Sequence, residues 1–94
     1  MRIEWLRKAA ANLDAEASYI ASDNPQAAAR SVSRILAAVE LLAQQPDLGR
    51  PGRIHGTREL IVSGSPYIVP YRVKNGCVQI LRVFHSARRA PGSW

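Results

Sequence analysis

The sequence is poor in cysteine, in histidine and in long apolar runs, and each shortage excludes a class of protein. The single cysteine, Cys77, cannot form an internal disulfide, and the two histidines do not complete a recognisable zinc-binding set. No stretch reaches the roughly 18 apolar residues of a membrane span, and the first residues lack the apolar core of a signal peptide. We therefore expect a cytoplasmic protein that stays out of the membrane and needs no metal or other cofactor.

Acidic residues are also scarce, but only in the second half of the chain. Residues 1–48 hold five basic and six acidic side chains, whereas residues 49–94 hold eight basic side chains and a single acidic one, Glu59. Seven of the eight are arginine, whose planar guanidinium matches the geometry of carboxylate and phosphate groups. The second half therefore has a net charge of +7, which favours binding to nucleic acid, a ribosome or an acidic protein. The alternative is a soluble surface that happens to be rich in arginine.

The first half of the chain predicts a helical hairpin. A short strand at residues 2–5, in which Ile3 and Trp5 alternate with Arg2 and Glu4, is followed by a helix over residues 6–22 and a second helix over residues 25–44. Asn24 is a favourable N-cap and Pro25 suits the first helical position, so the two helices should pack antiparallel across a short link. Their apolar stripes are Leu6, Ala10, Leu13, Ala17 and Ile20 in the first helix and Val32, Ile35, Leu36, Val39 and Leu42 in the second.

The second half predicts strands. An arginine-bearing loop rich in glycine and proline covers residues 46–57, and Asn75-Gly76 is typical of a two-residue type I′ hairpin turn. The predicted strands cover residues 58–62, 67–73 and 77–85. Counting from the turn predicts four cross-strand pairs, namely Lys74 with Cys77, Val73 with Val78, Tyr71 with Ile80 and Tyr67 with Phe84.

The predicted order is a strand, two helices and a three-stranded antiparallel meander. This is an α+β fold in which the helical hairpin packs on one face of a four-stranded sheet. Pro70 falls inside a predicted strand, where its missing N–H should interrupt the ladder, so we expect a bulge or an edge position there. The 94 residues have room for one domain, which should span residues 1–94 with a flexible tail at residues 86–94.

Four sequence motifs, in this order and spacing, resemble the RelE/ParE toxin superfamily. They are Glu4-Trp5 with Tyr19-Ile20; DNPQAA; PDLGRPGR followed by TRELIV; and YIVPYRV, NG and VQILRVFHSARR. Together they span nearly the whole chain. The resemblance implies a ParE-like toxin of a type II toxin–antitoxin module. It also implies a cognate antitoxin, ParD-like or RelB-like, that joins the toxin in a hetero-oligomer.

The resemblance implies one of two modes of action. RelE-like toxins cut mRNA in the ribosome, whereas ParE-like toxins poison DNA gyrase without hydrolytic chemistry of their own. RNA cleavage through the 2′-hydroxyl needs a base, an acid and cations that stabilise the phosphorane. His85 matches a position where some nucleases hold a catalytic histidine, and Arg82 and Arg88 would bind phosphate. However, Gly52 stands where some nuclease relatives carry a glutamate base, and Ile68 stands where they often carry an arginine.

These departures favour a gyrase inhibitor, with a ribosome-dependent mRNA endonuclease as the alternative and a simple nucleic-acid-binding domain as the third hypothesis. The arginines expected to bind the target or the antitoxin are Arg50, Arg53, Arg58, Arg72, Arg82 and Arg89. Arg82 has a structural alternative, which is an ion pair with Glu59. We expect Tyr67 and Tyr71 in the core rather than as platforms for RNA bases. The alanine-rich faces of the two helices are candidates for an antitoxin helix.

Overall fold

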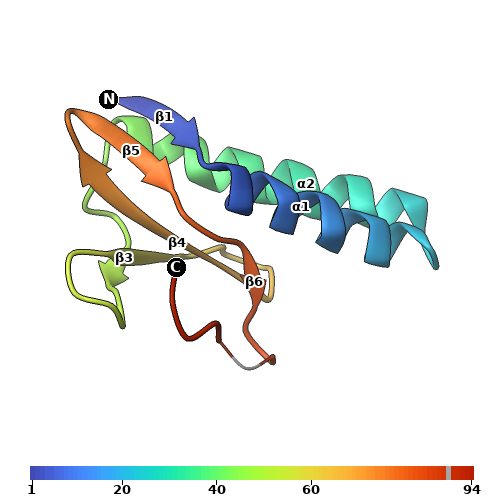
Figure 1. Ribbon diagram of the computed structural model, residues 1–94. Coiled ribbons are helices and arrows are strands. Elements are labelled where there is room, and N and C mark those ends of the chain that lie inside the picture. The colour runs from blue at the N-terminus through green and yellow to red at the C-terminus, as the bar shows by residue number, and fades with distance from the viewer. Residues whose placement is uncertain (89) are drawn as a thin grey trace.

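In the computed structural model, two helices lie side by side along one face of a mixed sheet (Figure 1). The structure describes residues 1–88 and 90–94. The elements are β1 (Arg2–Trp5), α1 (Arg7–Ala21), α2 (Pro25–Glu40), the 3-10 helix η1 (Leu41–Ala43), β2 (Arg50–Pro51), β3 (Arg58–Ile61), β4 (Tyr67–Lys74), β5 (Cys77–Ile80) and β6 (Phe84–His85). The predicted order of strand, helical hairpin and antiparallel meander is therefore confirmed. Within the described residues, no helix is both long and apolar enough to cross a membrane.

The sheet has the strand order β1-β5-β4-β3-β2, and the short β6 pairs with β4. β1 runs parallel to β5, whereas all the other strand pairs are antiparallel. The parallel pair is possible because the helices and three strands intervene between β1 and β5, and parallel strands need a long connection. Relative to the four strands expected, β2 adds a short edge strand and the predicted last strand is divided into β5 and β6.

The hairpin turn sets the register of β4 and β5 as predicted. Asn75 and Gly76 both adopt positive φ, at 53° and 69°, as a type I′ turn requires. Three predicted pairs are confirmed, namely Lys74 with Cys77, Val73 with Val78 and Tyr71 with Ile80. The fourth is wrong, because Tyr67 lies opposite His85 and not opposite Phe84.

Pro70 accounts for the division of the last strand. The carbonyl oxygen of Pro70 accepts a hydrogen bond from the Leu81 N–H at 2.9 Å. The N–H and C=O of a residue in a strand point to the same side, so the N–H that Pro70 lacks would also have faced the last strand. The ladder stops after Ile80 and resumes with Phe84 opposite Ile68, one residue out of the earlier register. A one-residue shift of this kind is a β-bulge. The bulge that the sequence predicts near Pro70 is therefore confirmed, and it explains the incorrect fourth pair.

Helix α1 buries a face that differs slightly from the predicted stripe. Ala9 and Glu16 are buried, whereas Ala10, which the sequence placed on the stripe, is exposed. Leu13 and Ile20 pack against the core as expected. The side chain of alanine is so small that the pattern barely distinguishes positions 9 and 10. Glu16 is buried because it has an ion-pair partner, which is described below.

Helix α2 and the 3-10 helix η1 that continues it supply most of the helical side of the core. Ile35, Val39 and Leu42 are fully buried, but Leu36 is 41% exposed although the sequence placed it on the stripe. The sheet residues that share this core are Leu60, Val62, Tyr67, Val69, Tyr71, Val78, Ile80 and Val83. Both tyrosines predicted for the core are among them. Burial of each large apolar side chain contributes about 1.5–3 kcal/mol, so this layer stabilises the packing of the hairpin on the sheet.

The start of α2 is fixed by the predicted cap. Asn24 Oδ1 accepts a hydrogen bond from the Ala27 N–H at 3.0 Å, and Pro25 occupies the first turn. An Asn24→Ala substitution removes the acceptor, so we expect the free energy of unfolding in urea to fall by about 1 kcal/mol. The exposed neighbour Asp23 provides the control, because Asp23→Ala should cost less than about 0.5 kcal/mol. Equal losses in the two variants would contradict the capping role.

Candidate functional site

Strand alternation gives the sheet two faces of different character. One face packs against the helices, and we call the face that points away from them the open face. Four rows of side chains cross the open face: Arg2, Cys77 and Lys74; Glu4, Gln79 and Arg72; Pro70, Glu59 and Arg50; and Phe84, Ile68 and Ile61. The two middle rows therefore bring two of the predicted arginines, Arg50 and Arg72, to the same face.

Glu59 is a buried carboxylate that holds two of the predicted arginines at the edge of the open face. The Nη2 of Arg50 donates to one carboxylate oxygen at 2.9 Å, and the backbone N–H of Arg53 donates to the other at 2.9 Å. Burial raises the pKa of Glu59, but these hydrogen bonds and the charges of both arginines outweigh burial and hold the pKa below its ordinary value of 4.5. The side chain of Arg50 remains 58% exposed, so its guanidinium is still accessible to a partner.

A chain of hydrogen bonds crosses the open face along the next row. The Nε of Arg72 donates to Gln79 Oε1 at 2.7 Å, and Gln79 Nε2 donates to Glu4 Oε1 at 3.0 Å. Arg72 makes no salt bridge to the residues that the structure describes. Its two terminal nitrogens are therefore left for a partner outside the chain.

The final described segment folds back over the apolar row of the open face (Figure 1). The Trp94 ring stacks on Phe84 with the ring centroids 5.8 Å apart, and its indole N–H donates to Thr57 Oγ1 at 3.2 Å. The guanidinium of Arg53 lies 5.1 Å from the centroid of the Trp94 ring and also donates to the Pro91 carbonyl. The tail thus touches the predicted arginine cluster. The flexibility that we expect of this tail stays a prediction.

Arg58 makes its contacts within the chain, although the sequence predicts a partner contact for it. It lies opposite Tyr71 in a row that faces the helices, and its Nη1 donates to the Gly49 carbonyl at 2.7 Å. The Tyr71 hydroxyl accepts from the Gly49 N–H at 2.8 Å and donates to the Pro46 carbonyl at 2.7 Å. These contacts fix the loop before β2, and they therefore fix the position of Arg50.

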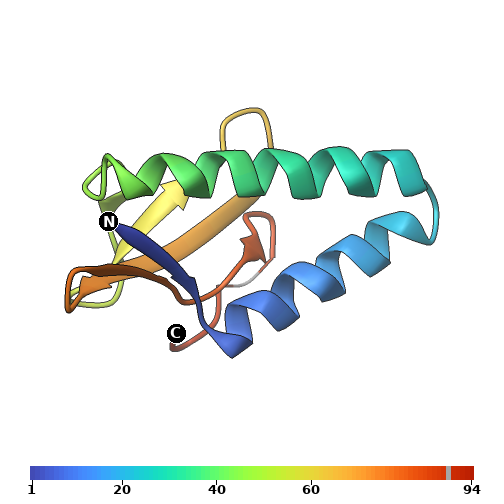
Figure 2. The ribbon, with the colours of Figure 1, turned by 90° about the horizontal axis from the view of Figure 1, so that it is seen from above.

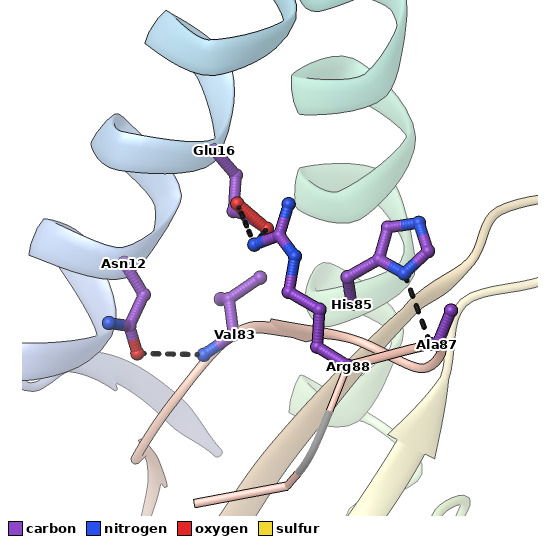
Figure 3. A network of polar contacts seen from close by, with 6 residues as sticks. All are labelled: Asn12, Glu16, Val83, His85, Ala87 and Arg88. Carbon is purple, nitrogen blue, oxygen red and sulfur yellow. Dashed lines mark hydrogen bonds and ion pairs between the residues drawn. The ribbon is translucent and has the colours of Figure 1, made fainter.

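Of the three side chains that the nuclease alternative would use, His85 and Arg88 line one hollow, but both have partners within the chain. The Nη1 of Arg88 donates to both carboxylate oxygens of Glu16, at 2.6 and 2.8 Å (Figure 3). These hydrogen bonds and the charge of Glu16 raise the pKa of Arg88. His85 lies opposite Tyr67 on the side that faces the helices, and its Nδ1 accepts from the Ala87 N–H at 3.1 Å. Arg88 is thus ion-paired within the fold although its side chain stays 51% exposed, and one nitrogen of His85 is already engaged.

Arg82 lies in the bulge between β5 and β6 and is half-buried. The ion pair with Glu59 that the sequence offered for it is not found, because Arg50 occupies that carboxylate. Its Nε is buried and has no hydrogen-bond partner among residues 1–88 and 90–94. The next residue, Val83, is tied to α1 because its N–H donates to Asn12 Oδ1 at 3.2 Å (Figure 3). The predicted functional contact of Arg82 therefore stays a prediction.

The loop before β3 has no room for the base of a nuclease. A Cβ added at Gly52 would lie 2.2 Å from Thr57 Oγ1, so a glutamate at this position would require the loop to change conformation. Ile68, where nuclease relatives often carry an arginine, is half-buried on the open face, and His55 is exposed in the same loop as Gly52. Arg89, the last arginine predicted to bind a partner, lies outside the described residues.

Sequence reasoning missed the side chains that hold the arginines in place. The position of Gln79 opposite Arg72 follows from counting back from the hairpin turn, so the sequence contained that signal. By contrast, Glu16 and Arg88 are 72 residues apart in the chain. Only the packing of α1 beside the end of β6 brings them together, and no local pattern predicts it.

The outer side of the helical hairpin carries a shallow hollow of about 500 Å³. Figure 2 shows the two helices meeting at the tight turn that joins them and diverging away from it. The residues that line the hollow are all small or apolar, namely Ala17, Ser18, Ala21, Ala28, Ala29, Val32 and Ser33. Arg30 and Arg34 line the adjoining surface of α2. The alanine-rich helix faces noted in the sequence thus form one continuous apolar surface with a basic border.

Comparison with known proteins agrees with this architecture. Residues 3–90 match the family described as the ParE toxin of the type II toxin–antitoxin system parDE. The chain is 49% identical to the Y4kP protein of Sinorhizobium fredii over 90 residues, which cover 96% of this chain and 93% of that protein. It is 38% identical to toxin RelE2 of Caulobacter vibrioides over 87 residues, which cover 93% of this chain and 97% of the toxin.

A solved structure shows the same fold. It is described as a chromosomal ParDE toxin–antitoxin system from P. aeruginosa and has a TM-score of 0.83 and a sequence identity of 38%. The match covers 90% of this chain and 95% of the other. The match to the family over nearly the whole sequence and the shared fold lead to one conclusion: the chain belongs to the ParE toxin family and is the toxin of a type II toxin–antitoxin system, which implies an antitoxin partner.

Proposed function

We propose that this toxin inhibits DNA gyrase by binding to it through the open face of the sheet, without cleaving RNA. The observation that carries the proposal is the gathering of three arginines at one side of the sheet. Arg50, Arg53 and Arg72 present guanidinium groups on or beside the open face. Arg88 lines a hollow with Arg50 and Arg53 and pairs with Glu16, so it adds to the same basic surface.

A binding mechanism needs only what the open face supplies. Guanidinium groups arranged on one face attract an acidic protein surface, accelerate association and then form charge-assisted hydrogen bonds. Cleavage would instead need a base within hydrogen-bond reach of the 2′-hydroxyl and a free cation beside the phosphate. Gly52 provides no base, and the Nδ1 of His85 is engaged by the Ala87 N–H. Inhibition by binding therefore needs fewer catalytic groups than RNA cleavage and fits the residues present.

We propose in addition that the antitoxin, whether ParD-like or RelB-like, anchors one helix on the helical hairpin and silences the toxin by wrapping a second, acidic segment over the arginines of the open face. An amphipathic helix of the antitoxin would pack into the alanine-lined hollow on the outer side of the hairpin. Acidic residues beside that helix would pair with Arg30 and Arg34, which line the adjoining surface. The two proteins would then form a hetero-oligomer in the cytoplasm, where gyrase acts.

Supercoiling of relaxed plasmid by purified gyrase tests the proposal directly. We expect the purified toxin to reduce supercoiling in a concentration-dependent manner and an Arg50→Ala/Arg72→Ala variant to need at least about tenfold more protein, because two charge-assisted contacts are lost. Addition of the antitoxin should restore supercoiling. Full supercoiling at an excess of folded toxin would remove the gyrase proposal.

A ribosome-dependent mRNA endonuclease is the second candidate, and one observation favours it. His85 and Arg88 line the same hollow, of about 450 Å³, next to the exposed ring of Tyr19. Primer extension on translated mRNA distinguishes the two functions. Cleavage that disappears in a His85→Ala variant would favour the endonuclease, whereas intact mRNA with inhibited gyrase would favour the first proposal.

A further inference from the structure

The hydrogen-bonded row on the open face holds one arginine in an unusually defined orientation. Arg72, Gln79 and Glu4 lie directly opposite one another on β4, β5 and β1, and all three are half-buried. The 2.7 Å contact from Arg72 Nε to Gln79 and the 3.0 Å contact from Gln79 to Glu4 join them in one line. An exposed arginine otherwise samples many rotamers. Here the Nε is anchored, so the two terminal nitrogens are the free end of the guanidinium.

We propose that Gln79 and Glu4 are positioning residues that aim the terminal nitrogens of Arg72 at a carboxylate on the protein target. The inference deepens the proposed function and rests on it, because it identifies the chemistry by which the open face recognises gyrase. With its Nε occupied, Arg72 offers a terminal pair of N–H groups that fits a carboxylate in bidentate fashion. Gln79 orients the guanidinium, and Glu4 orients the amide of Gln79.

Arg72 lies between carboxylates and cations on the open face. Glu4 lies in the same row and Glu59 in the neighbouring row on one side, whereas Arg2 and Lys74 lie in the neighbouring row on the other side. A single carboxylate on a protein surface can reach Arg72 without approaching Glu4 or Glu59. Closely spaced phosphates of a nucleic acid would meet these carboxylates as well as the cations, and this alternative is tested below with a DNA duplex.

The positioning role predicts that Gln79 acts only through Arg72. An Arg72→Ala variant should weaken binding to purified gyrase at least about tenfold, because it removes a charge-assisted bidentate contact. A Gln79→Ala variant should weaken binding about threefold to tenfold, because the freed guanidinium must then be ordered when the complex forms. In the Arg72→Ala background, the same Gln79 substitution should change the Kd less than about twofold.

A double-mutant cycle with calorimetry or fluorescence anisotropy measures this coupling. Losses that add in the double variant, or an unchanged Kd for Gln79→Ala alone, would overturn the proposal. Substitutions of Glu4 provide a conservative rescue. Glu4→Gln retains an oxygen that accepts a hydrogen bond from Gln79, so this variant should bind gyrase at least as tightly as the wild type. Glu4→Ala removes that oxygen and should weaken binding as Gln79→Ala does. Thermal unfolding of each variant separates a loss of positioning from a loss of folding. Arg7→Ala controls for net charge, because it removes one positive charge from an exposed position of α1.

Two further measurements distinguish failure of this inference from failure of the proposed function. Binding to a short DNA duplex without gyrase tests the phosphate alternative, and coupling between Arg72 and Gln79 in that complex but not with gyrase would overturn the carboxylate assignment. If the wild-type toxin does not bind gyrase, the proposed function fails, and the same cycle is measured with the antitoxin. Coupling there would support the positioning role, and its absence would overturn it.

Discussion

A Gly49→Ala substitution is expected to lower the free energy of unfolding by about 3 kcal/mol, because the loop before β2 leaves no room for a methyl group. The added Cβ would lie 2.7 Å from Tyr71 Cε1 and 2.9 Å from the carbonyl oxygen of Glu59. Neither neighbour can move cheaply, because Tyr71 is fully buried and the second atom belongs to the backbone of β3. Relaxation would also break the hydrogen bond from the Gly49 N–H to the Tyr71 hydroxyl.

Urea unfolding of the wild type and of two glycine variants measures this effect. Gly92→Ala is the matched control, because a Cβ at Gly92 would meet nothing within 4 Å and the change should be within about 0.5 kcal/mol. We also expect Gly49→Ala to inhibit gyrase less well, since Gly49 fixes the loop that positions Arg50. Equal stability of the two variants would show that the loop tolerates a side chain and would contradict the packing described here.

The second large effect is the pH dependence that Glu59 confers on stability. The pKa of Glu59 is lower in the folded protein than its ordinary value of 4.5, so the charged carboxylate stabilises the fold above that pH. This contribution is lost as the pH falls from about 4.5 through the lower, folded-state pKa. At pH 7, a Glu59→Gln variant should be about 1–3 kcal/mol less stable than the wild type, because the Arg53 N–H and the Arg50 guanidinium lose a charged acceptor.

Unfolding free energies measured between pH 3 and pH 7 test this prediction. The difference between the wild type and Glu59→Gln should be largest at neutral pH and should shrink as the pH falls below about 4.5. The exposed Glu40 supplies the control, because Glu40→Gln should leave the pH profile of the wild type unchanged. A difference that does not vary with pH would mean that the charge of Glu59 contributes nothing to stability.

Local signals in the sequence were sufficient for most of the fold. The Asn24 cap, the proline after it and the Asn75-Gly76 turn each specify a backbone geometry, so the helical hairpin and the register near the turn could be predicted. The register beyond Pro70 could not, because the number of residues in a bulge depends on packing across the sheet. The short strand β2 was also missed, since its position depends on the contacts that Tyr71 and Arg58, distant in sequence, make with the loop before it.

The candidate site was predictable in composition but not in arrangement. The sequence identified the arginines, and it could not separate those that face outward from those that hold the fold together. All four side chains have partners in their own chain, but Arg58 lies on the side that faces the helices and Arg88 pairs with α1, whereas Arg50 and Arg72 lie on the open face. The partners that decide this, Glu16 among them, come from elements distant in sequence, so only the folded arrangement assigns them.

We propose that the arginines of the open face bind gyrase and that the antitoxin excludes gyrase from them. The most direct test is the anisotropy of fluorescently labelled toxin titrated with purified gyrase, with purified ribosomes and with gyrase in the presence of antitoxin. We predict saturable binding to gyrase that is weakened at least about tenfold in Arg50→Ala/Arg72→Ala and abolished by the antitoxin. Binding to ribosomes alone, or gyrase binding that the double substitution leaves intact, would contradict the account.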